Sequence, residues 1–253
     1  MSGHSKWSTI KRKKGATDAA RGRLFTRLIR EISVAARNGG GNPDSNPRLR
    51  LAVQNAKQAN MPADNIKRAI QKGTGELPGT SFEEITYEGY GAGGVAILVE
   101  VMTDNSNRAV SEMRHLFSRY NGNLGQSGSV AWMFTRKGNL TIPTGGANAA
   151  LNDDDLLGII VEAGADDMQT EREVHTITTS PHAFEDVKKA LEDKGIAIED
   201  ASLQMVPQNL VKVAGKEAEQ VLKLMESLEE HDDVQNVYAN FDIDETELES
   251  FSN

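Results

Sequence analysis

The chain of 253 residues contains no cysteine. It therefore offers no disulfide, no thiolate nucleophile and no cysteine-ligated zinc. No apolar run approaches the roughly 18 residues that a membrane-spanning helix requires, and no apolar signal-peptide core is present. These absences favour a reducing compartment. We expect a cytoplasmic protein with no membrane partner.

Motifs for small-molecule chemistry are also missing. No P-loop pattern occurs. Residues 89–94, GYGAGG, satisfy G-x-G-x-x-G, but a strand-like run follows them where the dinucleotide fingerprint needs a helix. We interpret this stretch as a glycine-rich turn between strands. No two histidines have metal-ligand spacing, so we expect no metal, cofactor or small-molecule substrate. The histidines are His4, His115, His175, His182 and His231.

Charge is distributed very unevenly along the chain. Residues 1–77 hold 16 Lys+Arg against 5 Asp+Glu, a net charge of +11, whereas the remaining residues hold 12 basic and 32 acidic side chains, a net charge of −20. Residues 73–81, GTGELPGTS, span the point where the net charge changes sign, and they have the composition of a linker. The sequence predicts a basic module attached to an acidic body. A basic head is also typical of organelle transit peptides, but residues 17–73 have the pattern of capped, packed helices.

Three helices are predicted in the basic module. The first runs from Thr17 or Asp18 to about Asn38, the second starts at Asn46-Pro47, and the third extends from near Pro62 to Gly73. On the first helix an apolar face opposes an arginine face, which Val34 interrupts. The arginines of this face are Arg23, Arg27, Arg30 and Arg37. The predicted inward residues are Leu24, Phe25, Leu28, Ile29, Ile32 and Ala36. We expect a small three-helix core with the arginines directed to solvent.

A face this poor in acids is typical of proteins that bind a polyanion, because solvated helix faces usually mix charges of both signs. The segment before the first helix adds basic residues and Trp7, which could stack on a base or anchor the segment to the helices. We predict nucleic-acid contacts from Lys6, Trp7, Lys11, Arg12, Lys13, Lys14, Arg21, Arg23, Arg27, Arg30, Arg37, Arg48, Arg50, Lys57, Lys67 and Arg68.

The acidic body alternates strands and helices, which predicts an α+β class with small sheets covered by helices. Strand-like runs are expected at 95–101, 128–134, 139–143, 173–179, 196–205, 209–213 and 234–241, with helices at 107–120, 154–163, 181–194 and 216–231. The last helix–strand pair could return to the first sheet. We therefore expect a basic helical domain at 1–77, an α/β domain at 78–132 plus 206–245, an inserted α/β domain at 133–205, and a tail at 246–253.

Several long motifs resemble the YebC family. They include GHSKW (3–7), GGGNPDSNPRLR (39–50), NMPADNIKRAIQKG (60–73), YEGYGAGGVAILVE (87–100) and GNLGQSGSVAWMF (122–134). Ala109 and Asn121 depart from the family pattern, where threonine and glycine are more usual. The resemblance implies a helical N-terminal domain followed by two α/β domains.

The resemblance also implies a role in gene expression. Bacterial members resemble DNA-binding transcriptional regulators, whereas mitochondrial relatives resemble translational activators, and bacterial relatives have been implicated in translation on the ribosome. It places nucleic-acid contacts at the matching positions His4, Lys6, Trp7, Lys11–Lys14 and the helix-face arginines. We expect a non-enzymatic regulator that binds DNA or ribosomal RNA, with the ribosome as a further candidate partner.

Two alternatives stay open. The acidic runs at 153–155, 166–167 and 230–233 could supply the carboxylates of a metal-dependent nuclease, although the first lies where a helix N-terminus favours negative charge and the others fall in expected loops. The acidic body could instead serve as a protein–protein adaptor.

Overall fold

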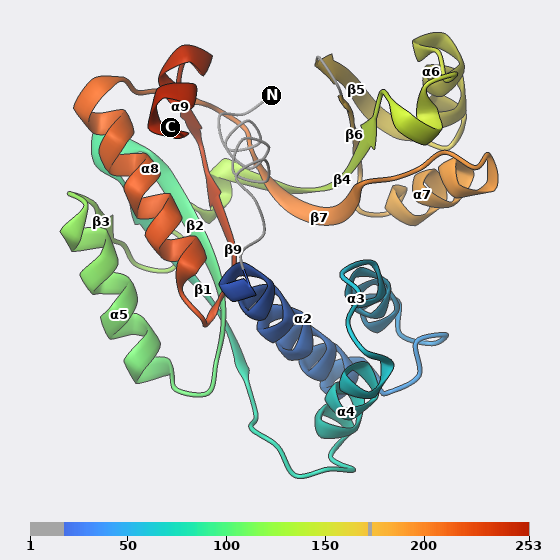
Figure 1. Ribbon diagram of the computed structural model, residues 1–253. Helices are drawn as coiled ribbons and strands as arrows, with labels where there is room; N and C mark the ends of the chain where they lie inside the picture. The colour runs from blue at the N-terminus through green and yellow to red at the C-terminus, as the bar shows by residue number, and fades with distance from the viewer. Residues whose placement is uncertain (1–17, 172–173, 253) are drawn as a thin grey trace. The chain divides into compact units, whose positions relative to one another are not determined.

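The structure, a computed structural model, describes residues 18–171 and 174–252 (Figure 1). One compact unit lies within residues 132–209, and the other comprises residues 18–131 and 210–252. Both units combine helices with antiparallel sheet, which confirms the predicted α+β class. No helix of the described residues is long and apolar enough to cross a membrane.

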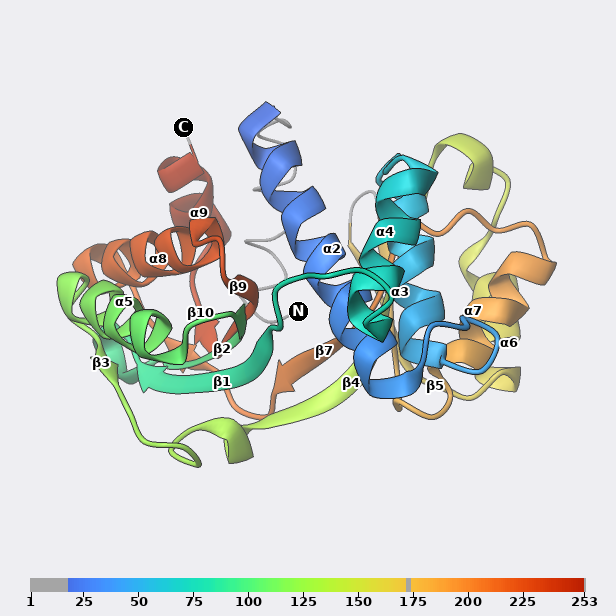
Figure 2. The ribbon, with the colours of Figure 1, turned by 90° about the horizontal axis from the view of Figure 1, so that it is seen from below.

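Three helices begin the larger unit: α2 (Asp18–Gly39), α3 (Pro47–Gln58) and α4 (Ala63–Thr74). Their apolar faces share one core, and α3 and α4 lie alongside α2 (Figure 2). The Asn46 side chain caps α3 by accepting the Leu49 N–H at 3.1 Å, and its amide nitrogen donates to the carbonyls of Ala35 and Gly40. One side chain therefore both starts α3 and ties it to the end of α2. Leu24, predicted to face inward, is 45% exposed.

The predicted end of the third helix at Gly73 is wrong. The helix α4 continues to Thr74, and Gly75 provides the left-handed C-cap with φ of 83°. Gly73 has a different role, because a Cβ at this position would lie 2.3 Å from the Ser33 carbonyl oxygen and 2.9 Å from the Ala36 Cβ. Glycine thus allows α2 and α4 to cross in direct contact.

An antiparallel sheet of order β3-β1-β2-β9 follows in the same unit. Two helices, α5 (Ser106–Arg119) and α8 (Gly215–Glu230), cover one of its faces and share its apolar core (Figure 1). A further helix, α9 (Glu245–Ser252), buries Leu248 in this core, within the segment that the sequence set apart as a tail. The strands of this sheet are β1 (Glu83–Tyr90), β2 (Ala96–Thr103), β3 (Asn123–Leu124) and β9 (Val234–Ala239). Two further short strands, β8 (Val211–Lys212) and β10 (Phe241–Asp242), pair with each other in parallel.

Two turns of this unit contain residues that the sequence singled out. The GYGAGG stretch ends β1 at Tyr90 and then forms the short turn η1 (Ala92–Gly94) before β2, which agrees with the predicted turn between strands. Asn121, where glycine is more usual in the family, has a left-handed φ of 60°. Asparagine tolerates this conformation better than most residues, which explains how the position accommodates the change.

The smaller unit contains a second antiparallel sheet, of order β5-β6-β4-β7. Because β2 and β9 pair directly, this unit is an insertion between two strands of the first sheet, as predicted. The exact boundaries proposed for three domains stay predictions. The elements of the smaller unit are β4 (Phe134–Pro143), η3 (Gly146–Asn148), α6 (Asp153–Glu162), β5 (Ala165–Glu171), β6 (Val174–Thr179), α7 (Phe184–Asp193) and β7 (Asp200–Pro207).

Two expectations for residues 128–171 are wrong. Residues 128–133 are not a strand: they form a turn and the short helix η2 (Ala131–Met133), held by the buried Glu88 carboxylate, which accepts the N–H groups of Gly128, Val130 and Ala131 at 2.6–2.7 Å. The acidic pair at 166–167 lies in β5 and not in a loop, since β5 is stabilised by pairing with β6 along its length.

Candidate nucleic-acid interface

Arg30 lies at the centre of a buried contact between α2 and the first sheet. Its Nη1 is 2.8 Å from the Asp233 carboxylate, 2.7 Å from the Asp232 carbonyl oxygen and 3.0 Å from the Met102 carbonyl oxygen. The guanidinium also stacks over the Phe82 ring, 5.0 Å from its centroid. The Arg30 side chain is only 14% exposed. The expectation that this arginine faces solvent is therefore wrong.

Asp233 binds three side chains at once. Besides Arg30, its carboxylate accepts hydrogen bonds from Arg108 Nη2 at 2.9 Å and from Thr103 Oγ1 at 2.7 Å. Burial opposes ionisation of Asp233, but the hydrogen bonds from Arg108, Thr103 and Arg30 outweigh it and lower the pKa of the carboxyl below its usual range. Asp233 therefore remains an anion that joins α2, β2 and α5.

The neighbouring arginines of α2 contact the end of α8. Arg27 donates to the Glu229 carbonyl oxygen, and Arg23 lies 3.7 Å from the Glu230 carboxylate. Carbonyl groups at a helix C-terminus carry partial negative charge, so they attract the guanidinium groups. Desolvation by burial lowers the pKa of Arg27 despite the opposing influence of Glu229.

Three further arginines of the predicted set have intramolecular partners. Arg37 donates to Ser81 Oγ and to the Phe82 carbonyl oxygen. Arg48 bridges Glu31 at 2.7 Å and Glu84 at 2.6 Å, and the hydrogen bond that it donates to Glu31 raises the pKa of Arg48 in spite of its partial burial. Arg50 donates more weakly to loop carbonyls at 3.3–3.4 Å. These side chains hold the helices to one another and to the start of β1.

The other predicted cations are exposed. Arg21 lies over the Phe25 ring, 5.4 Å from its centroid. Lys57, Lys67 and Arg68 have no hydrogen-bond or ion-pair partner within the residues that the structure describes. The remaining predicted contacts, His4, Lys6, Trp7, Lys11, Arg12, Lys13 and Lys14, lie outside the described residues.

The exposed cations of α4 share one face. At about 100° per residue, Lys67 and Arg68 fall opposite the buried Ile66 and Ala69, whereas Lys72 lies to one side, nearer to Ala69. This face therefore presents positive charge that no acidic group of the described chain neutralises by direct contact.

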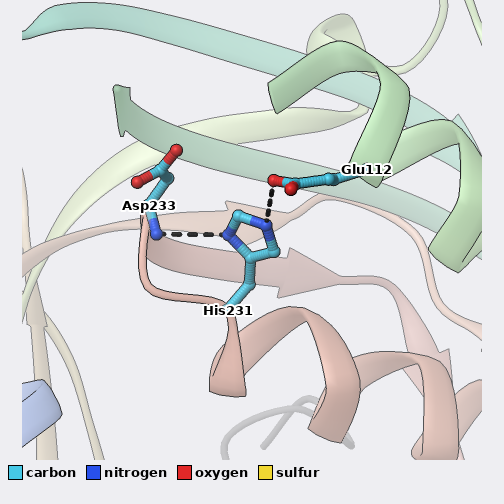
Figure 3. Close-up of side chains that lie close together, drawn as sticks. All are labelled: Glu112, His231 and Asp233. Atoms are coloured by element: carbon cyan, nitrogen blue, oxygen red, sulfur yellow. Dashed lines mark hydrogen bonds and ion pairs between the residues drawn. The ribbon is translucent and has the colours of Figure 1, made fainter. Parts of the chain in front are cut away.

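A cluster of Glu112, His231 and Asp233 brings together three residue types that ligate metals (Figure 3). The His231 Nε2 lies 2.9 Å from the Glu112 carboxylate, and its Nδ1 accepts the backbone N–H of Asp233 at 3.1 Å. Both ring nitrogens are thus engaged, and the Asp233 oxygens bind Arg30, Arg108 and Thr103. A cation would have to displace these bonds beside two guanidinium groups, so the chemistry fits a hydrogen-bonded cluster better than a metal centre.

The acidic runs do not converge in the described part of the chain on any other site with three metal-ligating side chains close together. Asp155 belongs to the N-terminal turn of α6, whose cap is Asn152, and Asp166 pairs with Lys137 at 2.8 Å. These acids therefore have local structural roles.

One signal in the sequence indicated that the arginine face of α2 is covered. Val34, which interrupts that face, is 1% exposed. A β-branched apolar residue among arginines indicates a packed surface, whereas Asp233 and Glu84 are too distant in sequence for any local pattern to pair them with α2.

Comparisons with known proteins cover nearly the whole chain. The description "TACO1/YebC protein N-terminal domain" matches residues 5–76, and "TACO1/YebC second and third domain" matches residues 82–241. A probable transcriptional regulatory protein of Geobacter sp. (strain M21) is 57% identical over 249 residues, which are 98% of this chain and 99% of that protein. Another, of Solibacter usitatus (strain Ellin6076), is 56% identical over 252 residues, covering 100% of both. The crystal structure of a conserved hypothetical protein from Aquifex aeolicus is 50% identical, with a TM-score of 0.82 over 90% of this chain and 93% of that one.

Proposed function

Since this chain belongs to the TACO1/YebC family, we propose that it is a non-enzymatic regulator of gene expression that acts by binding nucleic acid. The names of its relatives support a regulatory role, because they are called probable transcriptional regulatory proteins. The positive charge of residues 1–77 supports a polyanionic partner.

The observation that carries this proposal is the set of exposed cations on α3 and α4. Lys57, Lys67 and Arg68 remain available to phosphates, whereas Arg27 and Arg30 are occupied by carbonyl and carboxylate oxygens. We therefore assign the first contact with nucleic acid to the α3–α4 side of the helices. Contacts from Arg27 and Arg30 require the bonds to residues 229–233 to open first.

The negative charge of the acidic body, residues 78–253, restricts where nucleic acid can bind. Its net charge of −20 repels a polyanion, so nucleic acid is confined to the basic helices and cannot coat the whole surface. Phosphate contacts of this kind provide affinity and position but carry little sequence information. We propose duplex DNA and ribosomal RNA as the two candidate targets, which a direct competition distinguishes.

The test uses a triple variant, Lys57→Gln, Lys67→Gln and Arg68→Gln. A matched control, Lys189→Gln, Lys194→Gln and Lys212→Gln, removes the same charge from exposed lysines of the acidic body. Affinity for duplex DNA and for ribosomes is measured over a salt series, with each as competitor of the other. We expect the slope of log K against log salt to fall by about 0.7–0.9 for each phosphate that the interface variant no longer binds.

Each outcome has a clear meaning. Ribosome binding that survives excess duplex DNA near physiological salt makes the protein a translation factor. Loss of ribosome binding to DNA, with a retained preference for particular duplexes, makes it a transcriptional regulator. Equal slopes for the interface variant, the control variant and the wild type would contradict the assigned surface.

A further inference from the structure

A small hollow lies between α2, α4 and the segment that leads into β1. It is half open to solvent, has a volume of about 80 Å³, and is lined by Ser33, Arg37, Lys72, Thr80 and Ser81, together with residues 34, 73, 79 and 82. One water molecule needs roughly 10–15 Å³ measured in this way. The hollow therefore has room for a group of several heavy atoms.

Two glycines create this hollow. Gly73 allows α4 to touch α2, which brings Lys72 close to Ser33 and Arg37. Gly79 allows the following segment to lie against Lys72, since a Cβ at residue 79 would stand 3.0–3.2 Å from the Lys72 side-chain carbons. Figure 2 shows this segment passing from α4 toward β1 alongside α2. The close approaches place two cationic side chains at one small concavity.

The lining is rich in hydrogen-bond donors. Arg37 carries five N–H donors, of which two are engaged by Ser81 and the Phe82 carbonyl oxygen. The Lys72 ammonium adds three donors that have no partner within the described residues. Backbone N–H groups of Gly79, Thr80 and Ser81 likewise donate to no acceptor in the described part of the chain. Two cationic side chains with unused donors favour an anionic ligand.

The Glu84 carboxylate, two residues beyond the hollow-lining Phe82, is bound mainly by side chains other than Lys72. Glu84 binds Arg48 at 2.6 Å and Asn38 at 3.2 Å. The hydrogen bond from Arg48 lowers the pKa of Glu84 despite its partial burial. Arg48 is therefore the main partner of Glu84, which also attracts Arg37 electrostatically, whereas Lys72 has no acidic partner within the described residues and can attract a second anion.

We propose that this hollow binds one phosphate group, with Arg37 and Lys72 as its principal ligands. A guanidinium matches two phosphate oxygens, an ammonium supplies a point charge, and hydroxyl and backbone N–H donors complete the contacts of a tetrahedral oxyanion. As a place for a phosphate of the nucleic-acid backbone, the hollow rests on the proposed function. Free inorganic phosphate has the same chemistry and is the second source.

The test follows backbone amide resonances of the ¹⁵N-labelled full chain while inorganic phosphate is added at constant ionic strength. We expect saturable shifts at residues 79–82 and 72–73, which sodium chloride does not reproduce. Lys72→Gln should abolish them and Lys72→Arg should retain them. Lys67→Gln, on the same helix but outside the hollow, is the matched control and should leave them unchanged. Unperturbed spectra elsewhere establish that each variant is folded.

A second arm replaces phosphate by an oligonucleotide, either a short DNA duplex or a ribosomal RNA fragment. If its binding shifts the same resonances and Lys72→Gln lowers the salt slope by about 0.7–0.9, the hollow holds a backbone phosphate. If the oligonucleotide binds without moving these resonances and phosphate also leaves them in place, the hollow is not a phosphate site, while the proposed function stands. If phosphate binds in the hollow but no nucleic acid binds the chain, the phosphate site stands as a free-phosphate site and the proposed function fails.

Discussion

Arg30 and Asp233 form an ion pair of 2.8 Å although 203 residues separate them in the sequence. The pair connects a basic helix near one end of the chain to the turn between α8 and β9 near the other. Both partners are largely buried, at 14% and 4% side-chain exposure. Replacing Arg30 by an acidic residue would therefore break a buried ion pair of the fold as well as change the charge of the surface.

Breaking this pair should destabilise the protein. Arg30→Met leaves the buried Asp233 carboxylate with fewer partners, and Asp233→Asn weakens its bonds to Arg30 and Arg108. We expect each change to lower the free energy of unfolding by about 3–5 kcal/mol, as for other buried pairs that lose one partner. Urea denaturation of both variants and of the double variant measures the coupling.

The control for this experiment is Arg68→Gln, which removes an exposed arginine without a described partner. It should change stability by less than about 0.5 kcal/mol. Additive effects of the Arg30 and Asp233 substitutions would contradict a direct interaction between them.

Glu88 should make stability depend on acid pH. Burial opposes its ionisation, but the N–H groups of Gly128, Val130 and Ala131 outweigh burial and lower its pKa below the usual value of 4.5. A carboxyl with a depressed folded-state pKa contributes stability that is present above its unfolded-state pKa and lost as pH falls through the folded-state value.

Glu88→Gln removes that contribution. We expect the variant to be less stable than the wild type at pH 7 by about 1–3 kcal/mol, because an amide nitrogen faces N–H donors. The difference should shrink as pH falls below about 4. Thermal unfolding followed by circular dichroism from pH 7 to pH 3 measures it. A difference that stays constant over this range would contradict an anionic Glu88.

Two helical glycines should respond in opposite ways to alanine. Gly73→Ala places a methyl group 2.3 Å from the Ser33 carbonyl oxygen, so α2 and α4 must separate at a cost of about 1–3 kcal/mol. Gly22→Ala, on α2, meets no atom within 4 Å and should stabilise the protein by up to about 1 kcal/mol through helix propensity. Chemical denaturation of the two variants compares them directly. Equal effects would mean that the α2–α4 crossing is not close.

Divalent metals should not stabilise the Glu112–His231–Asp233 cluster. The His231 nitrogens and the Asp233 oxygens already have protein partners. Melting temperatures with and without magnesium, manganese or zinc should therefore agree, whereas a ligand of the folded state raises them. A rise that depends on metal concentration and disappears in Glu112→Gln would show a metal site.

Much of the fold follows from local pattern. The sequence predicted the start of α3 because Asn46 is an N-cap whose side chain accepts a backbone N–H group. It failed at β5, ADDMQTE, because acids and a scarcity of β-branched residues conceal a strand that pairing with β6 stabilises. It also failed at residues 128–133, where the tertiary contact with Glu88 overrides strand propensity.

The candidate interface was less predictable than the helices that carry it. A helical projection identifies which side chains oppose the apolar core, but it cannot show whether a second surface covers them. On α2 that second surface comes from residues 82, 102 and 229–233. On α4 the projection was sufficient, because Lys67 and Arg68 face no such partner in the described chain.

Because Asp233 lies far beyond Arg30 in the sequence, the ion pair between them can form only late in synthesis. Arg30 leaves the ribosome about 200 residues before its partner, which corresponds to roughly 10–40 s at 5–20 residues per second. The β2–β9 pairing that completes the first sheet is delayed in the same way. Throughout that interval the arginine surface of the nascent chain lacks the cover of residues 229–233, and it closes fully only when these residues have emerged.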